Sequence, residues 1–368
     1  MKTKRKQTKE KKGTFKEGLA WVKKHFRLRN DIITGKVFVM RRSSKTDEKE
    51  YSRGYMMERF AAAKKEYNAN TIRAVLAAWS PTAFNAFKER FLNPNVFESY
   101  SSRTNPFVKL EHFVELDGDH PFEFAKALEN HMVRAAKCAL DGQINKYVFT
   151  LLSDKQNVGK THFVDWLMSP VPGEFTMGSL PRSVTKIDQV LASKFIVNVD
   201  ELEGVDNTDS ARFKAITSQS VCTMFNAFKQ TSETRPRLAT FFATKNTKLD
   251  RGRSAFKGGG TSRFIAFKIK SIDFSYESAI DPLALWSWAF RRAQREGDES
   301  YPSIEEIRAQ EAFNRRFQEQ PKPRKRRRTR PNAVNTVAVT AAVGAFMFTP
   351  WGRALIAAIT TIARTAFN

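Results

Sequence analysis

Apolar residues recur every three or four positions through the first third of the chain. Side chains at this spacing share one face of an α-helix. Residues 15–120 are therefore predicted to form a small helical domain. The residues that carry the spacing, before and after Pro81, are Ile72, Val75, Leu76, Trp79, Phe84, Phe87 and Phe91. We interpret this aromatic stripe as core, with a base-stacking platform as the alternative.

The pattern changes after residue 120. An amphipathic helix is predicted from Glu123 to Asp141, with Gly142 at the position of a left-handed C-cap. Runs of consecutive apolar residues follow at 147–152, 194–199, 238–244 and 264–269. Such runs are typical of strands buried on both faces. Because helix-length segments separate them, residues 121–298 are predicted to form an α/β domain, a mostly parallel sheet with helices on both faces.

Two helices and a change of composition are predicted beyond this sheet. An aromatic helix follows Pro282, and Ser303 begins a charged helix with Glu306 at the capping-box position. A charged helix and basic linker are assigned to 299–332, and a hydrophobic segment to 333–368. That segment begins with an uncharged stretch somewhat shorter than the ~20 residues of a membrane span. One span or hairpin flanked by basic residues is the prediction, with an interfacial or oligomerisation helix as the alternative.

The charge balance points to a polyanionic partner. The chain carries 63 Lys and Arg against 38 Asp and Glu, a formal net charge of +25. Part of this excess lies at 324–330 and in residues 1–14, which are predicted to form a basic, disordered arm. The remainder is still basic. Nucleic acid is therefore the predicted partner, with acidic lipid or simple solubility as alternatives.

The cysteine content excludes two kinds of site. Cys138 and Cys222 are too few for a disulfide framework or a four-ligand zinc site. The basic N-terminus is not followed by an apolar signal segment. We therefore predict a reducing, cytoplasmic compartment, with membrane association only through 333–368.

A short loop at 153–161 joins the run at 147–152 to a helical segment. A strand, a loop and a helix in this order form the Walker A phosphate loop, whose backbone N–H groups and helix dipole hold phosphate oxygens. Lys160 is predicted to bind the β and γ phosphates of ATP, and the Thr161 hydroxyl to bind Mg²⁺. Asp154 stands where the motif has glycine. The other predicted nucleotide-binding residues are Lys155, Gln156, Asn157, Val158, Gly159 and His162.

Polar residues follow two further runs. Asp200 and Glu201 come directly after 194–199, and a nucleotide hydrolase needs a metal carboxylate and a base for water at the end of a neighbouring strand. Asp200 is predicted to hold Mg²⁺ through its water shell, and Glu201 to deprotonate the attacking water. Asn246, beyond 238–244, is predicted to contact the γ phosphate and this water, the role called sensor 1. A simple turn residue is the alternative for Asn246.

A glycine-rich loop places Arg263 at the start of the run at 264–269. An arginine there is predicted to reach the γ phosphate bound by a neighbouring subunit and to stabilise transition-state charge. Arg235 and Arg237 are the alternatives for this role.

These motifs resemble those of the virulence-associated E family of P-loop proteins, which is related to superfamily 3 helicases. The resemblance covers residues 105–269, and its segments are 105–107 (NPF), 155–161 (KQNVGKT), 198–202 (NVDEL), 213–218 (FKAITS), 244–246 (TKN) and 262–264 (SRF). It implies an AAA+-like ATPase of a phage, plasmid or other mobile element, which acts in DNA replication as a ring-shaped, hexameric helicase or a primase-associated factor. The predicted cytoplasm is then that of the host cell. Asp154 departs from the pattern, and the hydrophobic C-terminal segment is not part of it.

Three hypotheses follow from the sequence. The first is an ATP-dependent helicase that translocates on single-stranded DNA, with ATP bound between subunits and Arg263 acting in trans. The second is a membrane-attached ATPase that packages a viral genome. The third is a DNA-binding tether whose phosphate loop does not hydrolyse ATP because of Asp154. Candidate contacts to the DNA strand are Lys214, Lys229 and Lys257.

Overall fold

The computed structural model describes residues 13–44, 46–64, 66–92, 97, 104–181, 183–202, 210–226, 231–246, 261–295 and 300–317. Residues up to Glu319 belong to one compact unit. Most of the predicted basic arm, most of the basic linker and the whole hydrophobic segment at 333–368 lie outside the described residues. Within the described ranges, no helix combines the length and apolarity needed to cross a membrane.

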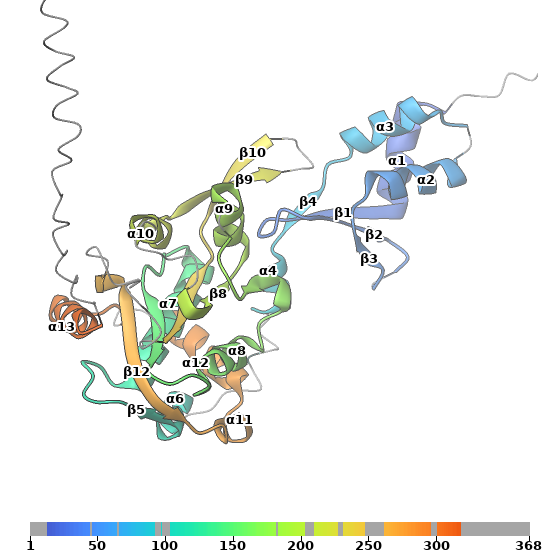
Figure 1. Ribbon diagram of the computed structural model, residues 1–368. Helices are drawn as coiled ribbons and strands as arrows, with labels where there is room; N and C mark the ends of the chain where they lie inside the picture. Colours follow the sequence, from blue (N-terminus) through green and yellow to red (C-terminus); the bar gives the residue numbers. More distant parts are fainter. Residues whose placement is uncertain are drawn as a thin grey trace, which may run out of the picture. The chain divides into compact units, whose positions relative to one another are not determined.

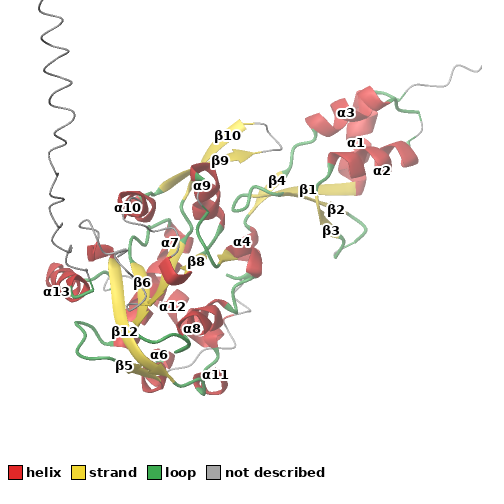
Figure 2. Cartoon of the chain, in the orientation of Figure 1, coloured by secondary structure: helices red, strands yellow, loops and turns green. Residues whose placement is uncertain are grey.

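The N-terminal part contains a four-stranded sheet, so the prediction of a purely helical domain was wrong (Figure 2). Buried residues alternate with more exposed ones along much of its first two strands, which is the period of two expected of a strand. This alternation was not recognised in the sequence, because the helical spacing around residue 75 is the stronger signal. In the order β3-β2-β1-β4, the sheet consists of β1 (Phe26–Asp31), β2 (Val37–Arg41), β3 (Glu48–Glu50) and β4 (Thr82–Phe84). The helices of this part are α1 (Phe15–His25), α2 (Arg53–Ala63) and α3 (Ala69–Ala78).

The aromatic stripe lies in the core, as predicted, but it is divided between two cores. Trp79 belongs to the core of the N-terminal part, which begins at Val22. Phe87 and Phe91, each 1% exposed, pack instead into the core of the following part, which begins at Ala86. The two cores therefore separate near residue 80, well before the boundary at 120 that the sequence suggested.

A six-stranded sheet occupies the middle of the chain, in the order β5-β12-β6-β11-β8-β7 (Figure 1). All neighbouring strands pair in parallel except β5, which is antiparallel to β12. The predicted α/β sheet is confirmed, and its four longest strands are the four apolar runs. The strands are β5 (Val114–Leu116), β6 (Val148–Ser153), β7 (Thr176–Met177), β8 (Ile196–Val199), β11 (Thr240–Asn246) and β12 (Phe264–Ile272).

Helices cover both faces of this sheet. Phe149 and Leu151 of β6 pack into one hydrophobic cluster and Val148 and Leu152 into another, so alternate side chains serve opposite layers. This double burial explains why the strands are apolar at consecutive positions. The helices are α4 (Ala86–Arg90), α6 (Pro106–Leu110), α7 (Phe124–Asp141), α8 (Lys160–Met168), α9 (Val184–Ser193), α10 (Ser210–Ser218), α11 (Tyr276–Ala279), α12 (Pro282–Ala293) and α13 (Ile304–Arg315).

The predicted helix ends are present, and one hairpin was not predicted. Gly142 ends α7 in the left-handed region, with φ of 72°, and Ser303 forms a capping box with Glu306 at the start of α13. Between α10 and β11, the strands β9 (Val221–Asn226) and β10 (Thr231–Pro236) form an antiparallel hairpin. The residues of β10 are exposed or half-buried, so no apolar run marks this strand in the sequence.

Candidate nucleotide site

Two residues of the loop between β6 and α8 have backbone angles in the left-handed region. Asn157 has φ of 58°, and Gly159, the N-cap of α8, has φ of 89°. A Cβ atom on Gly159 would lie 2.6 Å from Cζ of Phe274, so glycine suits both the backbone conformation and the close approach. A loop of this kind at a helix N-terminus directs backbone N–H groups toward one point and favours an anion there.

The predicted phosphate-loop lysine meets the predicted sensor residue. Lys160 is 6% exposed, and its Nζ donates to Asn246 Oδ1 at 2.8 Å and lies 3.5 Å from the carbonyl oxygen of Lys155. The two residues come together because β11 pairs with β6 in a register that sets Asn246 opposite Ser153. The ammonium group therefore lies between the loop and the neighbouring strand.

The predicted magnesium residues also meet. Thr161 Oγ1 donates to Asp200 Oδ1 at 2.8 Å, and Thr244 Oγ1 donates to the same oxygen. Asp165 lies one turn beyond Thr161 on α8, where burial and the negative charge of Asp200 raise its pKa, partly offset by a hydrogen bond from Asn198. This concentration of acidic charge favours a cation.

Among the described residues, no three His, Cys, Asp or Glu side chains are grouped to hold a metal ion by themselves. Mg²⁺ in nucleotide sites is typically held by one or two protein oxygens together with substrate phosphates. The hydroxyl of Thr161 and the carboxylate of Asp200 are suited to that smaller set of ligands.

Glu201 lies beside Asp200 in a short 3₁₀ helix (Asp200–Leu202), and its side chain is outside the described part. The next residue, Leu202, is buried and has φ of 47°. A positive φ is uncommon outside glycine. In the described ranges only Asn157 and Leu202 combine a side chain with positive φ; Asn157 lies in the loop before α8, and Leu202 directly follows Glu201.

The remaining predicted nucleotide-binding residues are exposed or half-buried. His162 is exposed in the first turn of α8; its Nε2 pairs with a Glu277 carboxylate oxygen, and its ring centroid lies 5.3 Å from that of Phe274. The other exposed or half-buried side chains of the loop are those of Asp154, Lys155, Gln156, Asn157 and Val158.

The three candidate arginines have different surroundings. Arg263 donates to the carbonyl oxygen of Lys214 and, at 2.8 Å, to Thr217 Oγ1, so it is held by α10 of its own chain. Arg235 donates to the carbonyl oxygen of Ile32 at 2.7 Å. Arg237 is 1% exposed. A side chain buried to that degree is not available to a neighbouring subunit.

Sequence reasoning missed Thr244, Asp165 and the partner of Asp154. Thr244 lies two positions before Asn246, so both project from the same face of β11, and this pair of polar residues in an apolar strand was a usable signal. Asp154 pairs with Lys268 of β12 at 2.9 Å. No local pattern predicts that contact, because it depends on strand order.

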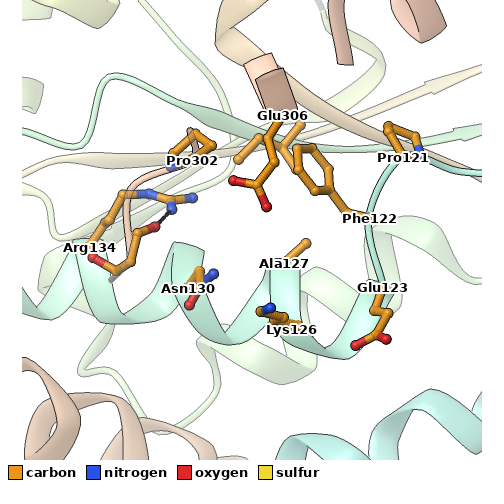
Figure 3. Close-up of a pocket in the computed structure, with 11 residues that line it drawn as sticks. Pro121, Phe122, Glu123, Lys126, Ala127, Asn130, Arg134, Pro302 and Glu306 are labelled. Carbon is orange, nitrogen blue, oxygen red and sulfur yellow. Dashed lines mark hydrogen bonds between the residues drawn. The ribbon is translucent and has the colours of Figure 1, made fainter. Parts of the chain in front are cut away.

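A separate cavity of about 210 Å³ lies beside α7 and contains none of the predicted site residues (Figure 3). Arg134 and Glu306 are in its wall, and Arg134 is bonded to the carbonyl oxygen of Ser300. Its β12 residue, Ile265, pairs with Phe149 near the start of β6, toward the amino edge of the sheet. Ligands of open α/β sheets bind at the carboxyl edge instead.

A family model, the virulence-associated protein E-like domain, matches residues 122–319, more than half of the chain. The chain belongs to this family. The virulence-associated protein E-like domain thus spans α7 to α13 and contains every predicted site residue. The family identified from the motifs is confirmed.

Solved structures with a similar arrangement have low sequence identity to this family member. The apo structure of the NrS-1 C-terminal region is 13% identical, with a TM-score of 0.46, over 80% of this chain and 73% of that one. SCCmec type IV Cch, described as an active helicase, is 11% identical, with a TM-score of 0.36, over 71% of this chain and 57% of that one. No curated protein matches the chain.

Proposed function

We propose that the chain hydrolyses ATP to translocate as an oligomeric ring on single-stranded DNA, in replication of a phage, plasmid or other mobile element. One observation carries this proposal. Lys160 bonds to Asn246 at the end of β11, and Thr161 bonds to Asp200 directly after β8, so the start of α8 and the ends of two parallel strands meet at the carboxyl edge of the sheet. Nucleotides bind at this edge in open α/β sheets.

The contacts suggest a role for each side chain. We assign Lys160 to the β and γ phosphates, for which its ammonium would exchange the bond with Asn246, and we assign the Asn246 amide to the γ phosphate and the lytic water. Glu201 is the proposed base for that water because it directly follows Asp200. Arg263 bonds to α10 of its own chain, so its proposed action on a neighbouring subunit requires release of two hydrogen bonds.

The donor set suits Mg²⁺. Thr161 would supply a hydroxyl oxygen and Asp200 a carboxylate, directly or through water, while Thr244 holds the carboxylate in place by its own hydrogen bond. When bound, Mg²⁺ neutralises charge on the phosphate oxygens.

DNA as the partner rests on the net charge of +25. Lys214 lies on α10, while Lys229, between β9 and β10, and Lys257 lie outside the described residues. We keep these three lysines as proposed strand contacts.

The proposal is tested by ATP hydrolysis with and without single-stranded DNA. Replacing the base, Glu201→Gln, should lower the DNA-stimulated rate at least about 100-fold, the usual contribution of a general base. Lys160→Ala should abolish hydrolysis by weakening nucleotide binding, and Asn246→Ala should lower the rate with bound ATP retained. Arg308, exposed on α13, provides the matched surface control as Arg308→Ala.

Other outcomes favour the alternatives. DNA binding that is unaffected by ATP and by Lys160→Ala, with no hydrolysis in any variant, would support the DNA-binding tether. A chain truncated before Pro331 that keeps full unwinding activity would count against genome packaging from a membrane.

A further inference from the structure

Asp154, which occupies a glycine position of the phosphate-loop motif, is bound by a lysine from the neighbouring strand. Lys268 Nζ lies 2.9 Å from Asp154 Oδ2 and 2.7 Å from Asp117 Oδ2. Lys268 pairs with Leu152 of β6, two residues before Asp154, so the strand register brings the cation to the start of the loop. The Lys268 side chain is 22% exposed and that of Asp154 31% exposed, so solvent screens this pair only in part.

The backbone of Lys268 is fixed on both sides. Its N–H donates to Nε2 of His120 at 2.8 Å, and its carbonyl oxygen accepts from the N–H of Asp117 at 2.8 Å. Nδ1–H of His120 donates to the carbonyl oxygen of Gly118 at 2.9 Å, which leaves Nε2 free to accept. Burial lowers the pKa of His120 and keeps the ring neutral, as this acceptor role requires. These bonds restrict where the ammonium group can lie.

An acidic side chain at the start of a phosphate loop opposes the charge of its ligand. The carboxylate of Asp154 and the phosphates carry the same sign and repel each other, and solvent screens the half-buried carboxylate only in part. The Lys268 ammonium offsets that charge and ties the carboxylate to β12. The loop then presents its backbone N–H groups and Lys160 to the phosphates.

We propose that Lys268 is a positioning residue for nucleotide binding, which neutralises Asp154 and holds it against β12 so that the loop accepts ATP. This inference rests on the proposed function of the loop. It explains how this sequence tolerates an acid where the motif has glycine: the compensating charge comes from another strand.

The structure supplies a matched control on the same strand. Lys270 lies two residues beyond Lys268 and also pairs with a carboxylate of β5, Glu115, at 2.5 Å. Lys270→Met therefore removes a similar ion pair and leaves the pair between Lys268 and Asp154 in place.

The test is a set of dissociation constants for ATP and ADP, measured by calorimetric titration on the full chain. Lys268→Met should weaken ATP binding about tenfold, equivalent to about 1.4 kcal/mol. ADP binding should weaken less, because ADP has fewer phosphate charges. In the double variant Lys268→Met with Asp154→Gly, ATP affinity should return to within about threefold of Asp154→Gly alone, while Lys270→Met should match the wild type.

Three results would overturn the inference. The first is an ATP affinity of Lys268→Met equal to that of the wild type. The second is a loss of ATP affinity in Lys268→Met that the additional change Asp154→Gly does not restore. The third is an equal loss of ATP and ADP affinity together with a lower melting temperature, which would indicate a purely structural role. If the wild type binds no ATP, or if Lys160→Ala binds as well as the wild type, the nucleotide site itself is wrong and the inference falls with it. If the wild type binds ATP and Lys160→Ala binds it more weakly, but Lys268→Met binds ATP as tightly as the wild type, the inference alone is refuted and the nucleotide site stands.

Discussion

Replacing Arg237 by alanine removes a buried cation on which several chain segments converge. Its guanidinium donates to the carbonyl oxygens of Thr217, Ala239, Asn145 and Ile216 at 2.7, 2.8, 3.0 and 3.3 Å. Burial lowers its pKa to about 10, so the group is still charged at neutral pH. These oxygens belong to the end of α10, the approach to β6 and the approach to β11. Arg237 therefore links the end of α10 to the segments that lead into β6 and β11.

The cost follows from those four acceptors. Each buried acceptor left without its donor costs about 1–3 kcal/mol, so the lower figure gives roughly 4 kcal/mol for the set. For a chain of this size each 1 kcal/mol lowers the melting temperature by about 2 °C, and we expect a fall of roughly 8 °C.

The assay is thermal unfolding of Arg237→Ala beside Arg308→Ala, an exposed arginine of α13 that should unfold with the wild type. ATP hydrolysis is measured in parallel below both melting temperatures. Suppose that Arg237→Ala melts within about 1 °C of the wild type but loses DNA-stimulated hydrolysis. The structural role would then be wrong, and Arg237 would have to act on the nucleotide of a neighbouring subunit.

Three further predictions test other parts of the site and core. Gly159→Ala should weaken nucleotide binding and lower the free energy of unfolding by about 1–2 kcal/mol, because Gly159 has φ of 89° and a Cβ atom there would contact Phe274. In a double-mutant cycle of unfolding free energies, adding Phe274→Ala should remove the part of this loss that comes from the contact and leave the part that comes from the backbone. Burial holds the pKa of His131 well below its ordinary value, so the unfolded state binds the extra proton. Below pH ~6.5 the free energy of unfolding should therefore fall with falling pH, by at most about 1.4 kcal/mol per pH unit, and denaturation of His131→Phe should lack this contribution. Cys138 and Cys222 are buried, and burial raises the pKa of Cys222 to about 12, so iodoacetamide should label neither thiol at pH 8 until the protein is unfolded; rapid labelling of the native protein would contradict this burial.

The α/β domain was predictable because its strands are buried on both faces. β6, β8, β11 and β12 are apolar at consecutive positions for that reason, and their boundaries lie within a few residues of the predicted runs. The loop between β6 and α8 was predictable from its local order of strand, loop and helix. Both features depend on residues close together in the chain.

Contacts across the sheet were not predictable in the same way. Asn246 reaches Lys160 only because β11 lies next to β6, and Lys268 reaches Asp154 only because β12 lies on the other side. Alternating periodicity was missed in β1 and β2, where helical spacing nearby was stronger. The β9–β10 hairpin was not predicted, because β10 has only exposed or half-buried residues and therefore no apolar run in the sequence.

The strand order also determines when the site can form as the protein is synthesised. β6 and α8 leave the ribosome first, but β6 lies between β11 and β12, and Asn246 follows Lys160 by 86 positions. Pairing between such distant segments is slow, because loop-closure entropy is lost before the contacts form. A nascent chain that ends before β11 therefore has Lys160 without its partner Asn246. The polar residues of the candidate site stay apart in such a chain, because the central strand β6 still lacks its neighbours β11 and β12.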